Sequence, residues 1–344
     1  MRPLDGVRVL DLTRLLPGAY ATLLLADLGA DVVKIEDPRG GDGMRTLGPF
    51  AAGRNVYFER LNRGKRSVTL DLRAPEAGAV LDALLARADV AVDSFRPSTA
   101  RRLGVDAPAL RARHPRLVCA SISGFGHSGP YVERAAHDIN YQALAGLLKP
   151  PALPGPLVGD IGAAMQTAIG ILAALIQRQR TGEGSFVDVP IHEAALAWSM
   201  FPTTDDLARA CYTLYETSDG AWLALGALEP KFWRGFCERI GRPDLVPLQH
   251  ADGDERARVI AEVRAIVRGR TRADWLAAFA DADVCLTPVY DADEVRRDPH
   301  VRARHGAARA MSPAPALGAD TDALLEEAGV GAEARARLRE SGII

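Results

Sequence analysis

The sequence has few of the features that mark secreted, metal-binding or membrane proteins. It contains only 4 cysteines, and none of them forms a C-x-x-C pair or a ligand-like group with histidine. Scattered thiols of this kind are typical of a reduced compartment, so neither a disulfide nor a metal site is expected. The start has no recognisable signal peptide, and the apolar runs end before the ~20 residues that a membrane span needs. These absences predict a cytoplasmic protein without a membrane partner.

An excess of charge of either sign is also missing. The 42 lysines and arginines nearly balance the 44 acidic residues, and the formal net charge is -2. Such a protein has no overall field to hold nucleic acid, so an anionic ligand must be bound by a local group of basic residues. The glycine fingerprints of dinucleotide and nucleoside triphosphate sites are absent from the first strand–helix turn as well. We therefore expect neither a nucleic-acid partner nor such a cofactor.

The residues that are present predict two domains. The chain has 344 residues, of which 48% are hydrophobic, and single cores stop growing near ~250–300 residues. Over residues 1–200, strand-like and helix-like segments alternate, which is the α/β pattern of a parallel sheet with helical crossovers. This predicts a Rossmann-like large domain. Its predicted strands are 7–12, 31–36, 67–72, 90–95, 117–123 and 186–191, its predicted helices are 19–28, 76–88, 162–180 and 193–200, and Pro17-Gly18 is expected to be a turn.

A different pattern follows the predicted large domain. Residues 201–211 form a short polar linker, and residues 212–300 predict a smaller α+β domain with a strand pair around Asp219 and a last strand at 285–290. The segment 305–344 contains two predicted helices, 320–328 and 332–338. We expect this segment to pack back on the large domain.

One histidine lies where it could exchange protons with a ligand. His137 follows the glycine-rich run from Gly124 to Pro130 and precedes an apolar helical segment. Histidine changes protonation state near neutral pH, and one at the opening of a helix beside a loop can act as a general base. The segment alone equally allows a structural interpretation, in which Asp138 caps the helix and His137 is a surface neighbour.

Two carboxylates, Asp160 and Glu229, each allow a structural and a functional interpretation. Asp160 is expected at the N-cap of a long helix, where it either accepts hydrogen bonds from the first turn or faces a substrate for which Gly159 and Gly162 leave room. Glu229 follows the apolar segment 221–228. It is either the first residue of a solvated loop or a residue that orients a catalytic histidine. Spacing does not decide between these alternatives.

Basic residues gather in the predicted large domain. Arg73 and Arg96 each fall at the end of a predicted strand, where guanidinium groups can clamp a phosphate-bearing ligand. Arg102 lies nearby in the sequence. A solvated charged face explains these residues as well.

Taken in order, these segments resemble the family III CoA-transferases and, within that superfamily, the α-methylacyl-CoA racemases. The resemblance runs from Leu4 to about His300, and the set of motifs is far more specific than any one of them. The segment from His137 to Tyr141 resembles the racemases in particular, because the transferases generally have no histidine there. The other carriers are the segments 28–36, 62–63, 70–73, 95–97 and 124–130 and those around Asp160 and Glu229.

The resemblance implies a role for each candidate residue. His137 corresponds to one catalytic base of the racemases, and Glu229 corresponds to the glutamate that supports it. Asp160 corresponds to the second racemase base and also to the nucleophile of the transferases, so it does not distinguish them. No separate cofactor is implied, because CoA is part of the substrate. The residues that match the family's CoA-binding segments are Leu70, Asp71, Leu72, Arg73, Ser94, Phe95, Arg96, Arg102, Ala136, Asp138, Ile139, Asn140 and Tyr141.

Two departures from the family pattern affect these expectations. One basic CoA contact falls on Asp37 in this chain, and we expect Lys34 to compensate as a CoA-binding residue. The family fold is an interlocked homodimer whose lobes are joined by long connections. The linker between Trp198 and Tyr212 is shorter than is usual, which puts the interlocking in question.

Three activities are consistent with the sequence. The resemblance favours a racemase that interconverts (R)- and (S)-2-methylacyl-CoA by 1,1-proton transfer through an enolate, whose oxygen would be held by backbone amides of the glycine loop or of the helix start at Gly162. The alternatives are a CoA-transferase that uses Asp160 as nucleophile and an acyl-CoA-binding protein without catalysis. The acyl group is left open, because the apolar residues of its pocket cannot be placed from one sequence.

Overall fold

The chain forms two compact units in a computed structural model that describes residues 1–200, 207–305 and 313–344. One consists of residues 1–200 and 310–344 and the other of residues 201–309. We call them the large unit and the small unit and describe each by itself. Residues 201–206 of the predicted linker lie outside the described residues.

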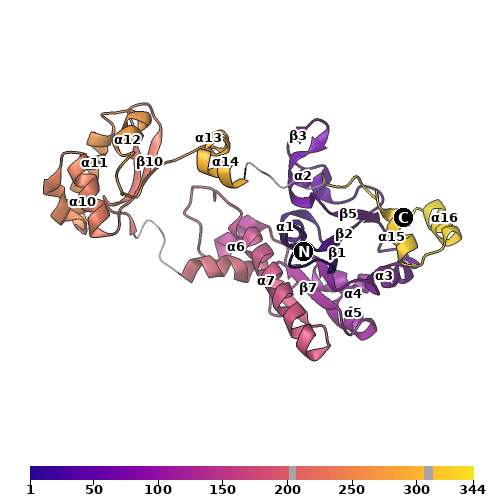
Figure 1. Cartoon of the computed structure of the whole chain (residues 1–344). Helices are drawn as coiled ribbons and strands as arrows, with labels where there is room; N and C mark the ends of the chain where they lie inside the picture. The colour runs from indigo at the N-terminus through magenta and orange to yellow at the C-terminus, as the bar shows by residue number, and fades with distance from the viewer. Residues whose placement is uncertain (201–206, 306–312) are drawn as a thin grey trace. The chain divides into compact units, whose positions relative to one another are not determined.

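A six-stranded sheet forms the centre of the large unit (Figure 1). Its order is β5-β2-β1-β6-β7-β8, and all neighbouring strands are parallel. The predicted Rossmann-like α/β fold is thus confirmed. The direction of strand addition reverses between β1 and β6, and in open α/β sheets such a reversal opens a crevice at the carboxyl ends of the strands. The strands are β1 (Arg8–Leu12), β2 (Asp31–Glu36), β5 (Arg66–Thr69), β6 (Val90–Asp93), β7 (Val118–Ser123) and β8 (Phe186–Pro190).

Helices cover both faces of this sheet. In β1, Val9 belongs to the core on one face, whereas the next residue, Leu10, belongs to the core on the other. Because side chains alternate across a strand, strands that are apolar throughout require cover on both sides. The first core is completed by α1 (Leu15–Asp27), α7 (Val158–Thr181) and α8 (Ile191–Leu196), and the second by α3 (Ala77–Leu85), α4 (Pro97–Leu103), α5 (Ala107–Arg113) and α15 (Thr321–Glu327).

The first helix begins earlier than the sequence indicates. It starts at Leu15, so the predicted turn at Pro17-Gly18 is wrong. Proline removes no hydrogen bond from the first turn of a helix. Gly18 packs so closely that an added Cβ would lie 2.1 Å from the Cβ of Thr13. The early start places Arg14 and Leu15 at the carboxyl end of β1.

The long helix α7 also departs from expectation. By length and composition it could cross a membrane, although the sequence analysis expected no apolar run of that length. However, 50% of its apolar window is buried, and α7 packs against α1, α8 and β7. This burial is typical of the core helix of a folded unit.

Shorter elements complete the large unit. The C-terminal segment packs on the sheet edge, where the N–H of Asp71 donates to the carbonyl of Ile343 at 2.8 Å. Figure 1 shows this segment in yellow beside α3. The remaining elements are β3 (Phe50–Ala51), β4 (Arg54–Asn55), α2 (Val56–Asn62), α6 (Asp138–Leu144), α16 (Ala332–Glu340) and two 3-10 turns, Gly43–Arg45 and Ala197–Met200.

The small unit is an α+β structure around an antiparallel sheet of order β11-β10-β9. Its core contains the buried rings of Tyr215, Trp233 and Phe236. The predicted strand pair around Asp219 corresponds to β9 and β10. The elements are β9 (Tyr212–Glu216), β10 (Trp222–Gly226), β11 (Leu286–Pro288), α10 (Pro230–Arg239), α11 (Gly253–Val267), α12 (Arg272–Ala278), α13 (Ala292–Arg297), α14 (Pro299–His305) and a 3-10 helix, Pro243–Leu248.

Candidate active site

Two adjoining cavities lie along the carboxyl ends of the parallel strands in the large unit. The β2-side cavity, of about 190 Å³, is lined by residues at the ends of β1, β2, β5 and β6. The β7-side cavity, of about 410 Å³, is lined by residues at the ends of β6, β7 and β8. Arg14, Phe95 and Thr99 line both cavities, so these three residues form a shared wall. The position is that expected from the reversal of strand order.

The structure brings His137 and Asp160 together as lining residues of the β7-side cavity. His137 is the N-cap residue of α6, and its backbone N–H donates to the Asn140 side chain at 3.0 Å. Asp160 is the third residue of α7 and is partly buried. The two predicted proton-transfer groups therefore come from the first turns of two different helices.

Asp160 does not cap its helix, contrary to the sequence prediction. The helix begins two residues earlier, at Val158. The backbone N–H of Asp160 is instead bound by Oδ1 of Asp138 at 3.0 Å. Asp138 is buried and also accepts from the Gln142 side chain. Asp138 thus links the starts of α6 and α7 rather than capping its own helix.

The glycines beside Asp160 serve this close packing rather than leaving room for a substrate. An added Cβ at Gly159 would lie 3.0 Å from Oδ1 of Asp138, and one at Gly162 would lie 3.1 Å from Nε1 of Trp198. Both distances are shorter than ordinary van der Waals contacts, so larger residues would push the segments apart. The expectation that these positions open the site is corrected.

The Asp160 carboxyl group has an unusual protonation equilibrium. Burial, reinforced by the negative charge of Asp138, raises its pKa to about 7. Near neutral pH the group is thus present as acid and as base in comparable amounts. A carboxyl group of this kind, placed in a cavity, can both accept and donate a proton.

Glu229 belongs to the small unit. It is the N-cap residue of α10, its side chain makes no capping hydrogen bond, and it is exposed. Its support of His137 stays a prediction.

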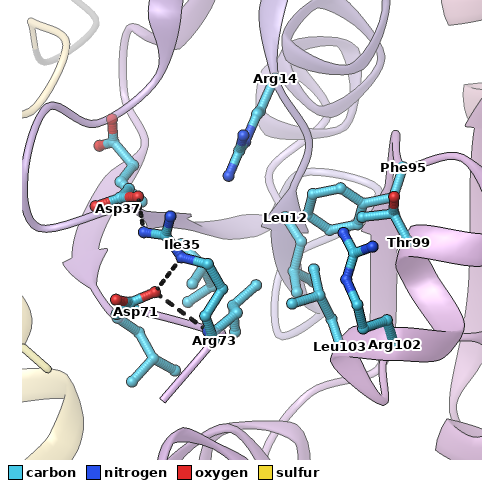
Figure 2. Close-up of a pocket in the computed structure, with 13 residues that line it drawn as sticks. Leu12, Arg14, Ile35, Asp37, Asp71, Arg73, Phe95, Thr99, Arg102 and Leu103 are labelled. Atoms are coloured by element: carbon cyan, nitrogen blue, oxygen red, sulfur yellow. Dashed lines mark hydrogen bonds and ion pairs between the residues drawn. The ribbon is translucent and has the colours of Figure 1, made fainter.

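Most residues that match CoA-binding segments line the two cavities. Figure 2 shows the β2-side cavity, with Asp71 and Arg73 on one side and Phe95 and Arg102 on the other. The β2-side cavity also includes Leu70 and Leu72, and the β7-side cavity includes Ser94, Phe95, Arg96, Ala136 and Tyr141. Four of the predicted CoA-binding residues line neither cavity: Lys34, Asp138, Ile139 and Asn140.

Lys34 is not available to bind CoA, so that prediction is wrong. Its side chain is fully buried, and Nζ lies 2.9 Å from Asp42 and 2.9 Å from the carbonyl of Thr13. Nζ also lies 4.0 Å from Asp11. The sequence shows a lysine in a strand but not the acids from two other segments that enclose it.

Asp37, where the resemblance implied a basic contact, is part of a ring of four charged residues. It binds Arg73 at 2.6 Å and Arg39 at 3.1 Å. Asp71 closes the ring, at 2.8 Å from Arg73 and 2.7 Å from Arg39. Partial burial opposes ionisation, but the hydrogen bonds and charge of Arg39 outweigh it and lower the pKa of Asp37. The ring has no net charge, so it neutralises Arg73 at the cavity edge.

The sequence analysis missed two arginines of the β7-side cavity. Arg14 and Arg134 line it, and neither was a candidate. Arg14 lies two residues after the end of β1, and a cation near a strand end was the signal that identified Arg73 and Arg96. The same signal was present at Arg14, because the predicted strand 7–12 ends at the same residue as β1.

Comparisons with known proteins agree on one family. The sequence profile of "CoA-transferase family III" matches residues 4–322. The human alpha-methylacyl-CoA racemase is 32% identical over 388 residues, covering 99% of this chain and 97% of that protein. The succinyl-CoA–D-citramalate CoA-transferase of Chloroflexus aurantiacus is 36% identical over 331 residues, covering 88% of this chain and 82% of that protein. The crystal structure of a CAIB/BAIF family protein from Brucella suis matches with a TM-score of 0.82 at 29% identity, covering 95% of this chain and 99% of that chain.

Proposed function

We propose that this chain, which belongs to CoA-transferase family III, acts on an acyl-CoA thioester. The proposed activity is that of a racemase that interconverts (R)- and (S)-2-methylacyl-CoA. The observation that carries the proposal is the presence of His137 and Asp160 in one cavity. Racemisation at a single carbon needs two proton-transfer groups that approach it from opposite faces. An imidazole and a carboxyl group that line one cavity from two different helices support this role.

The proposed reaction is a 1,1-proton transfer. One group removes the proton from C2, and the electron pair of the C–H bond moves toward the thioester oxygen to form an enolate. The other group then donates a proton to the opposite face of C2. A positioned acid or base of this kind contributes about 10²–10⁴-fold to the rate. The pKa of Asp160, about 7, suits both directions of the transfer.

The enolate oxygen needs hydrogen-bond donors that are already in place. The start of α7 offers few, because the N–H of Asp160 is bound by Asp138 and that of Ile161 by the carbonyl of Leu157. Gly162 lies further along the helix rather than at its start. We therefore favour the loop that begins at Gly124, which lines the β7-side cavity.

CoA transfer is the second candidate, supported by the transferases among the relatives. In this reaction the Asp160 carboxylate attacks the thioester carbonyl, CoA leaves as the thiolate, and an acyl-enzyme anhydride remains. The thiolate then attacks the Asp160 carbonyl of the anhydride, which releases the first acyl group as a carboxylate and leaves an enzyme–CoA thioester. An acceptor carboxylate attacks this thioester and displaces the thiolate, and the thiolate attacks the acceptor's carbonyl, which gives the new acyl-CoA and frees Asp160. His137 has no required role in this scheme.

Deuterium exchange separates the two candidates. Each enantiomer of a 2-methylacyl-CoA is incubated in D₂O, with and without a free carboxylic acid, and deuterium at C2 and the configuration are measured. A racemase incorporates deuterium from both enantiomers without the acid. Exchange of acyl groups that depends on the acid, with no deuterium at C2, would favour the transferase.

Single variants test the two-base mechanism more sharply. We expect His137→Gln and Asp160→Asn each to abolish inversion and to keep deuterium exchange with one enantiomer only, opposite for the two variants. His127→Gln is the matched control, because His127 lies outside both cavities and contacts Ser121 at 3.0 Å. Unchanged CoA binding in Asp160→Ala, together with no exchange in the wild type, would instead indicate a binding protein.

A further inference from the structure

The acid at position 37, where the family has a basic residue, raises the question of which group supplies the positive charge. The ring of Asp37, Arg39, Asp71 and Arg73 uses both of its arginines internally. A phosphate that approaches the β2-side cavity therefore meets a neutral ring rather than free cations. The compensating charge must come from another wall of the cavity.

Arg14 is placed to supply this charge. It lines both cavities and is exposed. Its guanidinium lies 5.5 Å from the centre of the Phe95 ring, and no acidic side chain in the described parts of the chain forms an ion pair with it. Figure 2 shows Arg14 directed toward the space between Asp37 and Phe95, without a dashed line to either. Its charge helps to lower the pKa of Asp37 at longer range, but no direct ion pair occupies its guanidinium within the described residues, so its N–H groups can still bind a ligand.

The backbone on both sides of Arg14 is fixed by hydrogen bonds. The Thr13 carbonyl accepts from Lys34 Nζ at 2.9 Å, and the Arg14 N–H donates to Ser94 Oγ at 2.9 Å. The Leu15 N–H donates to Asp42 at 3.2 Å. Lys34 and Asp42 are themselves buried and paired at 2.9 Å. The buried pair of Lys34 and Asp42 thus fixes the backbone on both sides of Arg14 through hydrogen bonds to Thr13 and Leu15.

Backbone strain marks the same loop. Leu15 has a φ of 62°, in the left-handed region that residues with a Cβ rarely adopt. Such a conformation is unfavourable for a residue with a Cβ and persists only where the surroundings impose it. Here the paired residues Lys34 and Asp42 impose it, and the result is a defined direction for Arg14.

We propose that Arg14 binds the diphosphate of CoA and supplies the positive charge that Asp37 cannot. This inference rests on the proposed CoA-thioester function. With the thioester beside His137 and Asp160 in the β7-side cavity and the nucleotide in the β2-side cavity, the diphosphate that joins them passes the shared wall. Arg14 stands on that wall. A guanidinium can bind two phosphate oxygens at once.

The test compares the affinity of Arg14→Gln and wild type for CoA and for 3′-dephospho-CoA by calorimetry. Removal of a charge-assisted hydrogen bond predicts an affinity about 10- to 100-fold weaker. The same decrease is expected with both ligands, because both keep the diphosphate. A decrease confined to CoA would assign Arg14 to the ribose phosphate and overturn the proposal, as would no decrease at all.

Arg101→Gln is the matched control. Arg101 is an exposed residue of α4 that lies outside both cavities, 4.0 Å from Glu133. The control variant removes the same charge from a neighbouring position, so an equal decrease in both variants would overturn direct binding by Arg14 in favour of a general field effect. Thermal unfolding checks that both variants fold. Failure of the wild type to bind CoA would instead reject the proposed function itself.

Discussion

Asp11 and Asp160 are two aspartates of the large unit whose surroundings give them opposite properties. Burial alone would raise the pKa of Asp11, but the charges of Lys34 and Lys65 outweigh it and lower the pKa to about 2. Asp160 has no such cations, so burial, with the charge of Asp138, raises its pKa to about 7. Asp11 is fully buried and Asp160 is partly buried beside a cavity, but the main difference is that only Asp11 has cationic partners.

The difference separates a structural role from a chemical one. Asp11 is bound by Lys65 at 3.1 Å and by the hydroxyl groups of Thr13 and Thr22, so its charge is fixed and its oxygens are occupied. Asp160 lines a cavity with a carboxyl group that can exchange a proton. A buried acid without a cation has a raised pKa, which suits it to proton transfer near neutral pH.

The largest expected effect on stability comes from removing the buried cation of Lys34, which pairs with Asp42 and lies near Asp11. Lys34→Met leaves Asp42 without its buried cation, and we expect the free energy of unfolding to fall by about 3–5 kcal/mol, because an uncompensated buried charge remains. Urea unfolding measures this decrease. Arg39→Gln, in the exposed ring, is the control and should change stability by less than about 1 kcal/mol. If Lys34→Met reduced the free energy of unfolding as little as Arg39→Gln, the buried ion pair of Lys34 and Asp42 would not contribute to stability.

Removing the carboxyl group of Asp160 should have the opposite effect and increase stability above neutral pH. Because the pKa of Asp160 is raised above its usual value of 3.8, to about 7, the unfolded chain releases its proton first as pH rises. The stability of the fold therefore decreases progressively between about pH 4 and pH 7, because the carboxyl group ionises in the unfolded chain before it ionises in the folded one. We expect Asp160→Asn to be more stable than the wild type at pH 8 and equal to it below pH 4.

Asp11 provides the contrast in the same experiment. Its lowered pKa contributes stability that is present above its unfolded value of 3.8 and is lost as pH falls toward about 2. Wild type and Asp160→Asn should therefore lose this contribution together in acid. Chemical unfolding at several pH values measures both trends. A stability difference between the two proteins that does not change with pH would contradict the assigned titration of Asp160.

The sequence predicted the sheet well, because each buried strand shows its own pattern. The predicted strand 31–36 coincides with β2, since an apolar run between polar turns depends little on the rest of the fold. Helix starts were less predictable. The starts of α1 and α7 depend on contacts of Gly18 and Gly159 with side chains outside each helix, which no local pattern reveals.

The candidate site was predictable to a similar degree. His137 and Asp160 were identified through a family resemblance, and the structure adds that they line one cavity. Whether a charged side chain is buried in an ion pair or exposed to a ligand was not predictable, because this depends on partners far away in the sequence. Lys34 and Arg14 illustrate this, since the lysine expected to bind the ligand is buried and the overlooked arginine is exposed.

The exposed ring offers the smallest and most specific test. Asp37→Asn removes one of the two acids that hold Arg73, and we expect CoA affinity to rise about 3- to 10-fold, because Arg73 gains freedom to bind phosphate. Stability should change by less than about 1 kcal/mol, since the ion pairs are solvent-exposed. Calorimetric titration with CoA measures the gain.

A second background shows whether the gain passes through Arg73. In Arg73→Gln, the further change Asp37→Asn should improve CoA affinity little, because the released cation is absent. An undiminished gain would mean that Asp37 acts by repelling the phosphates directly. In that case Asp37 would act on the ligand through its own charge, as is proposed for Asp160. It would not act through a paired cation, as Asp11 does with its lysines.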